Sequence, residues 1–74
     1  MEYNIEGGSV MIKLRRVVGT GPDQQTQICY VRPESIAVIE EHDDSAWVVM
    51  TDKSVIRTDM IVDEVVATLK AVGY

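Results

Sequence analysis

The sequence predicts the α+β fold class: a small, strongly bent antiparallel sheet of about five short strands, packed by one C-terminal amphipathic helix. Between residues 10 and 58, short runs of alternating apolar and polar residues are separated by turn-forming residues, which is typical of strands. From residue 61 onward, apolar residues recur at spacings of three and four, which predicts a helix with one apolar stripe. One such stripe packed on one small sheet makes a two-layer unit.

The chain divides into a predicted N-terminal arm, residues 1–8, and a single α+β domain, residues 9–74. The arm is polar apart from Tyr3 and Ile5, and it ends at a Gly-Gly pair that interrupts any regular element.

The first strand is predicted from Val10 onward, because Val10, Ile12 and Leu14 alternate with other residues and so share one face. The alternation stops at residues 16–18, which predicts a bulge or a strong bend. Residues 19–25 have the composition of a loop.

Four further strands are predicted from short segments bounded by polar or turn-forming residues: 26–32, 36–40, 46–51, and 54 to 57 or 58. Pro33 ends the second strand, because proline lacks the donor that a strand ladder needs. Residues 41–45 are a polar connection, and Asp52-Lys53 is a predicted two-residue hairpin turn.

The helix is predicted from a stripe of apolar residues: Ile61, Val62, Val65, Val66, Leu69 and Val72. Thr58 or Asp59 is expected to cap its N-terminus, and Gly73 is expected to terminate it. Valine is a mediocre helix former, so we expect tertiary or intersubunit packing to stabilise this helix.

The charge balance is acidic, with twelve acidic and seven basic residues and a net charge of −5. Binding to a phosphate backbone needs a basic field, so we do not expect nucleic acid as a partner. No apolar run approaches the ~20 residues of a membrane span, and we expect no membrane insertion. The N-terminus lacks the features of a secretory signal and the lone cysteine suits a reducing compartment, so the expected location is cytoplasmic.

The length of 74 residues predicts self-association. A domain of this size buries only ~60% of its unfolded surface and needs further stabilisation. Cys29 has no disulfide partner within the chain, and Cys29 and His42 are too few for a structural zinc site. We therefore expect a homo-oligomer, with a dimer favoured by base rates, and we expect no metal and no other cofactor.

The polar motifs do not predict catalysis. The acidic cluster at residues 40–44 is interpreted as a solvated loop, because consecutive carboxylates in an extended segment point apart. Cys29 is interpreted as a small buried apolar residue, since the sequence offers no His/Asn or His/Asp pair to complete a nucleophilic site. Gly19 and Gly21 lack the spacing of a nucleotide-binding loop. We predict that the chain is not an enzyme, and we assign no catalytic residues.

The predicted contacts with a partner or ligand are four basic residues and the single tryptophan: Lys13, Arg15, Arg16, Arg32 and Trp47. A basic patch that faces a protein is favoured over a platform for single-stranded nucleic acid, because the net charge is negative. Trp47 is also a candidate for an interface hot spot, although core packing is the favoured interpretation for a lone Trp in a strand.

These observations predict a small non-enzymatic protein-binding module, an adaptor or modulator of a larger protein assembly. Its partner would be another protein, bound by surface complementarity and exposed strand edges. Two alternatives stay open: a phage-encoded inhibitor of a host protein, and an oligomer that sequesters a small charged ligand between subunits.

Four short segments carry a resemblance to a known family. They are residues 11–19, residues 31–40, the predicted hairpin at 47–56, and residues 63–69. The first resembles a Met-Ile-x-Leu start, the second an Asn-Pro-Asp-x-Ile-x-x-Ile-Glu segment, and the last a terminal Glu-Glu-Val helix. Over about residues 11–72, the chain is thus similar to the FlbD-type (SwrD-type) small flagellar proteins. The resemblance implies a small, cytoplasmic, non-enzymatic accessory protein, and it supplies no catalytic residues.

Overall fold

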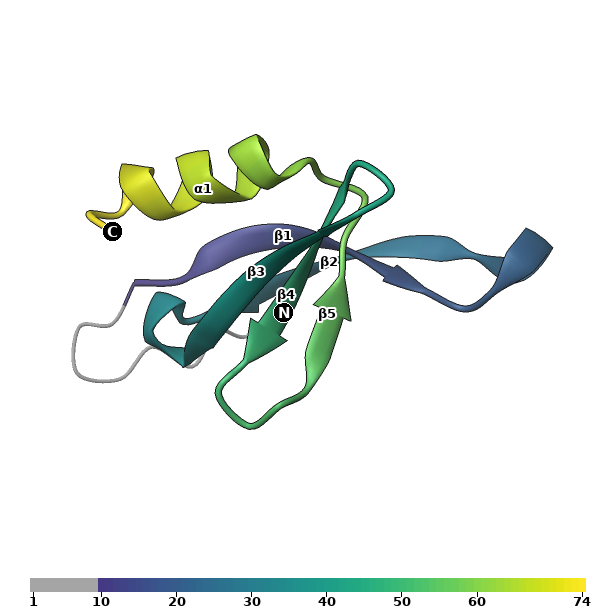
Figure 1. Cartoon of the computed structure of the whole chain (residues 1–74), viewed down its shortest axis with the longest axis horizontal. Helices are drawn as coiled ribbons and strands as arrows, with labels where there is room; N and C mark the ends of the chain where they lie inside the picture. Colours follow the sequence, from purple (N-terminus) through teal and green to yellow (C-terminus); the bar gives the residue numbers. More distant parts are fainter. Residues whose placement is uncertain (1–9) are drawn as a thin grey trace.

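The computed structural model describes residues 10–74, and the predicted arm at residues 1–8 lies outside them. Within residues 10–74, the elements follow in the order β1 (Ile12–Val18), the short 3-10 helix η1 (Gly21–Asp23), β2 (Gln25–Val31), the short 3-10 helix η2 (Pro33–Ser35), β3 (Ile36–His42), β4 (Ser45–Met50), β5 (Val55–Arg57) and α1 (Val62–Ala71). These antiparallel strands and the C-terminal helix packed on them confirm the predicted α+β fold class (Figure 1).

β1 and β2 form an uninterrupted antiparallel ribbon, from the pair Ile12–Val31 to the pair Val18–Gln25. Of the predicted bulge or strong bend at residues 16–18, the bulge is wrong, because the register continues there without a shift. A two-stranded ribbon can twist strongly without losing its register, so the change in apolar pattern does not require an extra residue.

Residues with positive φ shape the turns. Gly19 has φ +83°, and a Cβ at this position would lie 2.6 Å from a backbone oxygen of η1, so the turn requires glycine. Asp43 and Asp44 have φ values of 49° and 65°, the signs that a two-residue type I′ turn needs. The β3–β4 connection is therefore shorter than the predicted loop at residues 41–45. The β4–β5 turn is longer than the predicted two-residue turn at Asp52-Lys53: Met50 N donates to Ser54 O at 2.8 Å, so residues 51–53 form the turn, and Lys53 has φ 74°.

The strands described here form two sheets, β1–β2 and β3–β4–β5, instead of one continuous sheet. The sheets meet at a single antiparallel bridge between Arg16 and Thr58. Beside this bridge, Thr58 N donates to Ala46 O at 3.1 Å and Asp59 N donates to Arg15 O at 3.3 Å. The two sheets are thus linked where β1 meets the segment that follows β5.

The core lies between the two sheets and α1. Its buried side chains come from β1, β4, the segment before the helix, and α1: Ile12, Leu14, Ala46, Val48, Met60 and Val65. In Figure 1 the helix runs beside β1 and covers one end of the strand arrangement. Burial of Val65 in this cluster supplies the tertiary packing that a valine-rich helix needs.

Neither predicted N-cap residue caps α1. Ile61 occupies the cap position, and its backbone N–H donates a hydrogen bond to Glu64 Oε1 at 3.3 Å. The Thr58 hydroxyl is buried and donates to Ala46 O at 2.7 Å, so it is committed to the sheet junction. The Asp59 carboxylate is bonded to Arg15. Tertiary hydrogen bonds have here displaced local capping.

The end of α1 is as predicted. Gly73 has φ +95°, its N–H donates to Lys70 O at 3.1 Å, and Tyr74 N donates to Leu69 O at 2.9 Å. These two bonds make a Schellman motif, in which glycine adopts the left-handed conformation at low cost.

Candidate binding surfaces

A groove lies between α1 and the β1–β2 ribbon, and we call it the α1–β1 groove. Its volume is about 460 Å³, and its lining residues are Lys13, Arg15, Ile28, Met60, Glu64, Ala67 and Thr68. Arg15 and Ile28 are directly opposite in the β1–β2 register, so they share the ribbon face that is turned away from Leu14 and the core. The groove therefore combines an apolar floor with charged walls.

The two basic residues of the groove differ in their ion pairs. Arg15 Nε donates to Asp59 Oδ1 at 2.8 Å, and Arg15 Nη2 lies 3.6 Å from Glu64 Oε2. The hydrogen bond to Asp59, followed by Coulombic attraction, raises the pKa of the Arg15 guanidinium. Among residues 10–74, Lys13 makes no ion pair. Lys13 is thus the cation of this groove that is available to an external carboxylate.

The structure brings only two of the predicted contact residues together. Lys13 and Arg15 line the α1–β1 groove. Arg16 points to the other face of β1, at the bridge to Thr58, because successive residues of a strand alternate. Arg32 is half-buried between β2 and η2, and Trp47 lies on β4 of the other sheet. The basic residues therefore do not form one patch.

A second surface is the face of the β3–β4–β5 sheet turned away from the core, and we call it the outer face. Two cross-strand rows run over it: Val38–Val49–Val55 and Glu40–Trp47–Arg57. Val48 and Ala46 are fully buried on the opposite face, which confirms the direction of these side chains. Val38 and Val55 are 49% and 45% exposed. The outer face therefore presents apolar side chains to its surroundings.

Trp47 is half-buried on the outer face and stacks on His42, with ring centroids 4.1 Å apart and an interplanar angle of 23°. His42 Nε2 lies 3.0 Å from Glu40 Oε1. The sequence favoured core packing for Trp47, and this interpretation is wrong, because Trp47 lies half-buried on the face opposite the buried Val48. Trp is one of the residue types enriched at interface hot spots.

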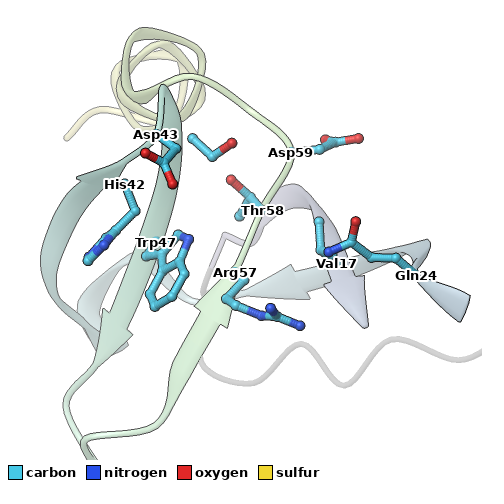
Figure 2. Close-up of a pocket in the computed structure, with 9 residues that line it drawn as sticks. Val17, Gln24, His42, Asp43, Trp47, Arg57, Thr58 and Asp59 are labelled. Atoms are coloured by element: carbon cyan, nitrogen blue, oxygen red, sulfur yellow. The ribbon is translucent and has the colours of Figure 1, made fainter. Parts of the chain in front are cut away.

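A hollow of about 280 Å³ borders Trp47, between β5 and the β1–β2 turn. Figure 2 shows Trp47 with His42 on one side and Arg57 on the other, and Val17 and Gln24 across the hollow. Arg57 Nη2 donates to Gly19 O at 3.0 Å, which holds the turn against β5. The aromatic wall and the guanidinium can receive a small planar or anionic group.

The exposed apolar residues Ile28, Val38 and Val55 are not among the residues predicted from the sequence to contact a partner, because in a sequence they resemble core residues. One signal was available. Val48 and Val49 are consecutive apolar residues in one strand, and consecutive side chains face opposite sides of a sheet. Such a pair indicates that both faces of β4 carry apolar surface.

Among residues 10–74, no cluster of three or more His, Cys, Asp or Glu side chains is arranged to hold a metal ion. Burial raises the pKa of the half-buried Cys29 thiol, although the charge of Arg16 opposes this effect. The environment of Cys29 thus favours the thiol over the nucleophilic thiolate.

In the part of the chain that the structure describes, no helix has the length and apolar character needed to cross a membrane. The FlbD-type resemblance stays a prediction. Comparison of the chain with protein-family models, with curated proteins and with solved structures finds no match.

Proposed function

We propose that the chain is a non-enzymatic protein-binding module and that the α1–β1 groove receives a segment of its partner. The observation that carries this proposal is the position of Lys13, a cation without an ion pair in residues 10–74, beside the half-exposed Ile28 and the floor made by Met60 and Ala67. A small apolar surface beside one defined charge favours a peptide segment over a small polar metabolite.

The chemistry of the groove describes the segment that fits. An apolar side chain of the partner packs between Ile28 and Ala67, and a neighbouring carboxylate pairs with Lys13. Glu64 on the helix side repels a second carboxylate, which sets the direction of the segment. Because the net charge of the whole chain is −5, specificity comes from this local arrangement and not from long-range attraction.

The proposed role is that of an adaptor or modulator of a larger cytoplasmic protein assembly. Because burial raises the pKa of Cys29, this proposal assigns the thiol no role. The small domain offers its surface, and the partner supplies the activity that is modulated.

Selection of displayed 12-residue peptides on the wild-type chain tests the proposal, with counter-selection on Lys13→Glu. We expect enrichment of peptides with an acidic residue next to an apolar one, and at least about tenfold weaker binding to Lys13→Glu, equivalent to ~1.4 kcal/mol. Lys70→Glu is the matched control, because it makes the same charge change at an exposed helix position outside the groove.

Amide chemical shifts then locate the bound peptide. Changes confined to β1, β2 and α1 support the proposal. Peptides that bind Lys13→Glu as tightly as the wild type, or shift changes confined to the outer face, contradict it.

A further inference from the structure

We infer that the outer face of the β3–β4–β5 sheet is the interface with a second copy of this chain, in a symmetric dimer whose two-fold axis runs along β4. This inference is independent of the proposed groove, because the outer face shares no residue with it. It rests on the apolar row of this face and on the order of charges across it.

The apolar row is the first observation. Val38, Val49 and Val55 are directly opposite one another on three neighbouring strands, and Trp47 adjoins them on β4. The two outer valines are about half exposed in the single chain. Four neighbouring apolar side chains on one sheet face form a continuous patch, and such patches mark interaction surfaces.

The charge order is the second observation, and it selects a second copy as the occupant. Glu40 on β3 and Arg57 on β5 lie on opposite sides of Trp47 in one cross-strand row. Rotation by half a turn about an axis parallel to β4 places the β3 edge of one protomer over the β5 edge of the other. Each cross-strand row keeps its position along β4. Glu40 of one protomer then faces Arg57 of its partner, twice per dimer. The face is therefore complementary to itself.

The direction of the axis follows from the same row. An axis perpendicular to β4 and passing over Trp47 would place Glu40 against Glu40 and Arg57 against Arg57, which is unfavourable. The axis parallel to β4 instead places the indole rings of Trp47 together at the centre and Val38 against Val55. Aromatic residues at the centre and charged pairs at the rim are the usual order of an interface.

The two charged side chains are already held in place. Arg57 donates to Gly19 O at 3.0 Å, and Glu40 lies 3.0 Å from His42. A guanidinium has five N–H donors and a carboxylate accepts several bonds, so each group keeps capacity for the other protomer. Side chains that are positioned before association lose less entropy when they bind.

The size of the face sets the expected strength. Three strands about 4.8 Å apart and up to seven residues long cover roughly 14 by 23 Å. A standard interface buries about 800 Å² on each partner, and this face is smaller. We therefore expect a weak, reversible dimer with a dissociation constant on the order of 100 μM.

Sedimentation equilibrium of the whole chain between about 5 μM and 1 mM tests the inference. The expected result for the wild type is a monomer–dimer equilibrium. Glu40→Arg should raise the dissociation constant at least tenfold, and the double variant Glu40→Arg/Arg57→Glu should restore it to within threefold. Glu41→Arg is the matched control, because it carries the same change on the neighbouring residue, whose side chain lies on the other face of β3.

Val38→Lys tests dimerisation without changing Arg57, and it is used if the double variant Glu40→Arg/Arg57→Glu fails to fold. Val38 is half exposed, so this substitution leaves the core intact and should abolish dimerisation. A wild-type chain that stays monomeric up to 1 mM, a Glu40→Arg or Val38→Lys variant that dimerises as the wild type does, or a folded double variant that stays monomeric would each overturn the inference.

Discussion

Arg15 and Asp59 form an ion pair, with 2.8 Å between Nε and Oδ1, although 44 positions separate them in the chain. The pair joins β1 to the segment between β5 and α1. It lies next to the backbone bond from Asp59 N to Arg15 O, so the two contacts reinforce the place where the sheets meet. The same pair also neutralises the cation that would otherwise compete with Lys13 in the α1–β1 groove.

Removal of this ion pair should have a small effect on stability. Both side chains are about two-fifths exposed, and solvent screens such pairs strongly. We expect Asp59→Asn to lower the melting temperature by no more than about 4 °C in low salt, and the difference should shrink in about 1 M NaCl. Glu41→Gln, at an exposed strand position without an ion pair in residues 10–74, serves as the control. A loss that is large and independent of salt would contradict this account.

Thr58→Val should destabilise the chain much more. The Thr58 hydroxyl is buried, donates to Ala46 O at 2.7 Å and accepts from Met60 N at 3.2 Å. Valine has nearly the same shape but leaves the Met60 N–H without this acceptor. The expected loss is about 1–3 kcal/mol in the free energy of unfolding, measured with urea. Thr51→Val, at an exposed turn, should change it by less than about 0.5 kcal/mol. Equal losses for the two variants would refute the assigned role of Thr58.

Asp52 should carry a pH-dependent contribution to stability. The hydrogen bond from Ser54 Oγ, at 2.6 Å, and the bond from Ser54 N lower the pKa of Asp52. A carboxyl with a lower pKa in the folded chain stabilises the fold above its unfolded pKa, and this stabilisation is lost as the pH falls through the folded pKa. In Ser54→Ala, carbon-detected NMR titration should show a higher Asp52 pKa.

The stability difference between the wild type and Ser54→Ala should accordingly narrow as the pH falls below about 4. A difference that is constant between pH 2 and 7 would mean that Ser54 acts on the turn without the charge of Asp52.

Cys29 should react slowly with thiol reagents. Burial raises its pKa, so less thiolate is present at a given pH, and the side chain is only half accessible. We expect alkylation by iodoacetamide at pH 8 to be at least about tenfold slower than in urea-unfolded chain. Arg16→Gln should slow it further, because the charge of Arg16 lowers this pKa. A folded-state rate equal to that of the unfolded chain would show that Cys29 is not protected.

Residue spacing alone was sufficient to predict the strands, the helix and its end. Ile12 and Leu14 alternate because a strand places every second side chain on one face, Val65 and Leu69 recur at helical spacing, and Gly73 suits a left-handed terminus. These features depend on backbone geometry within a few residues. They can therefore be recognised without knowledge of which elements pack together.

The surfaces depended on pairing between distant segments. Lys13 and Ile28 share a groove only because β1 pairs with β2 in a particular register, and a shift of one residue would move Ile28 to the core face. Thr58 has the spacing of a helix cap, yet its hydroxyl bonds Ala46 because burial makes an unpaired polar group costly. Local spacing thus determined the elements, whereas long-range register and burial determined which side chains were left to meet a partner.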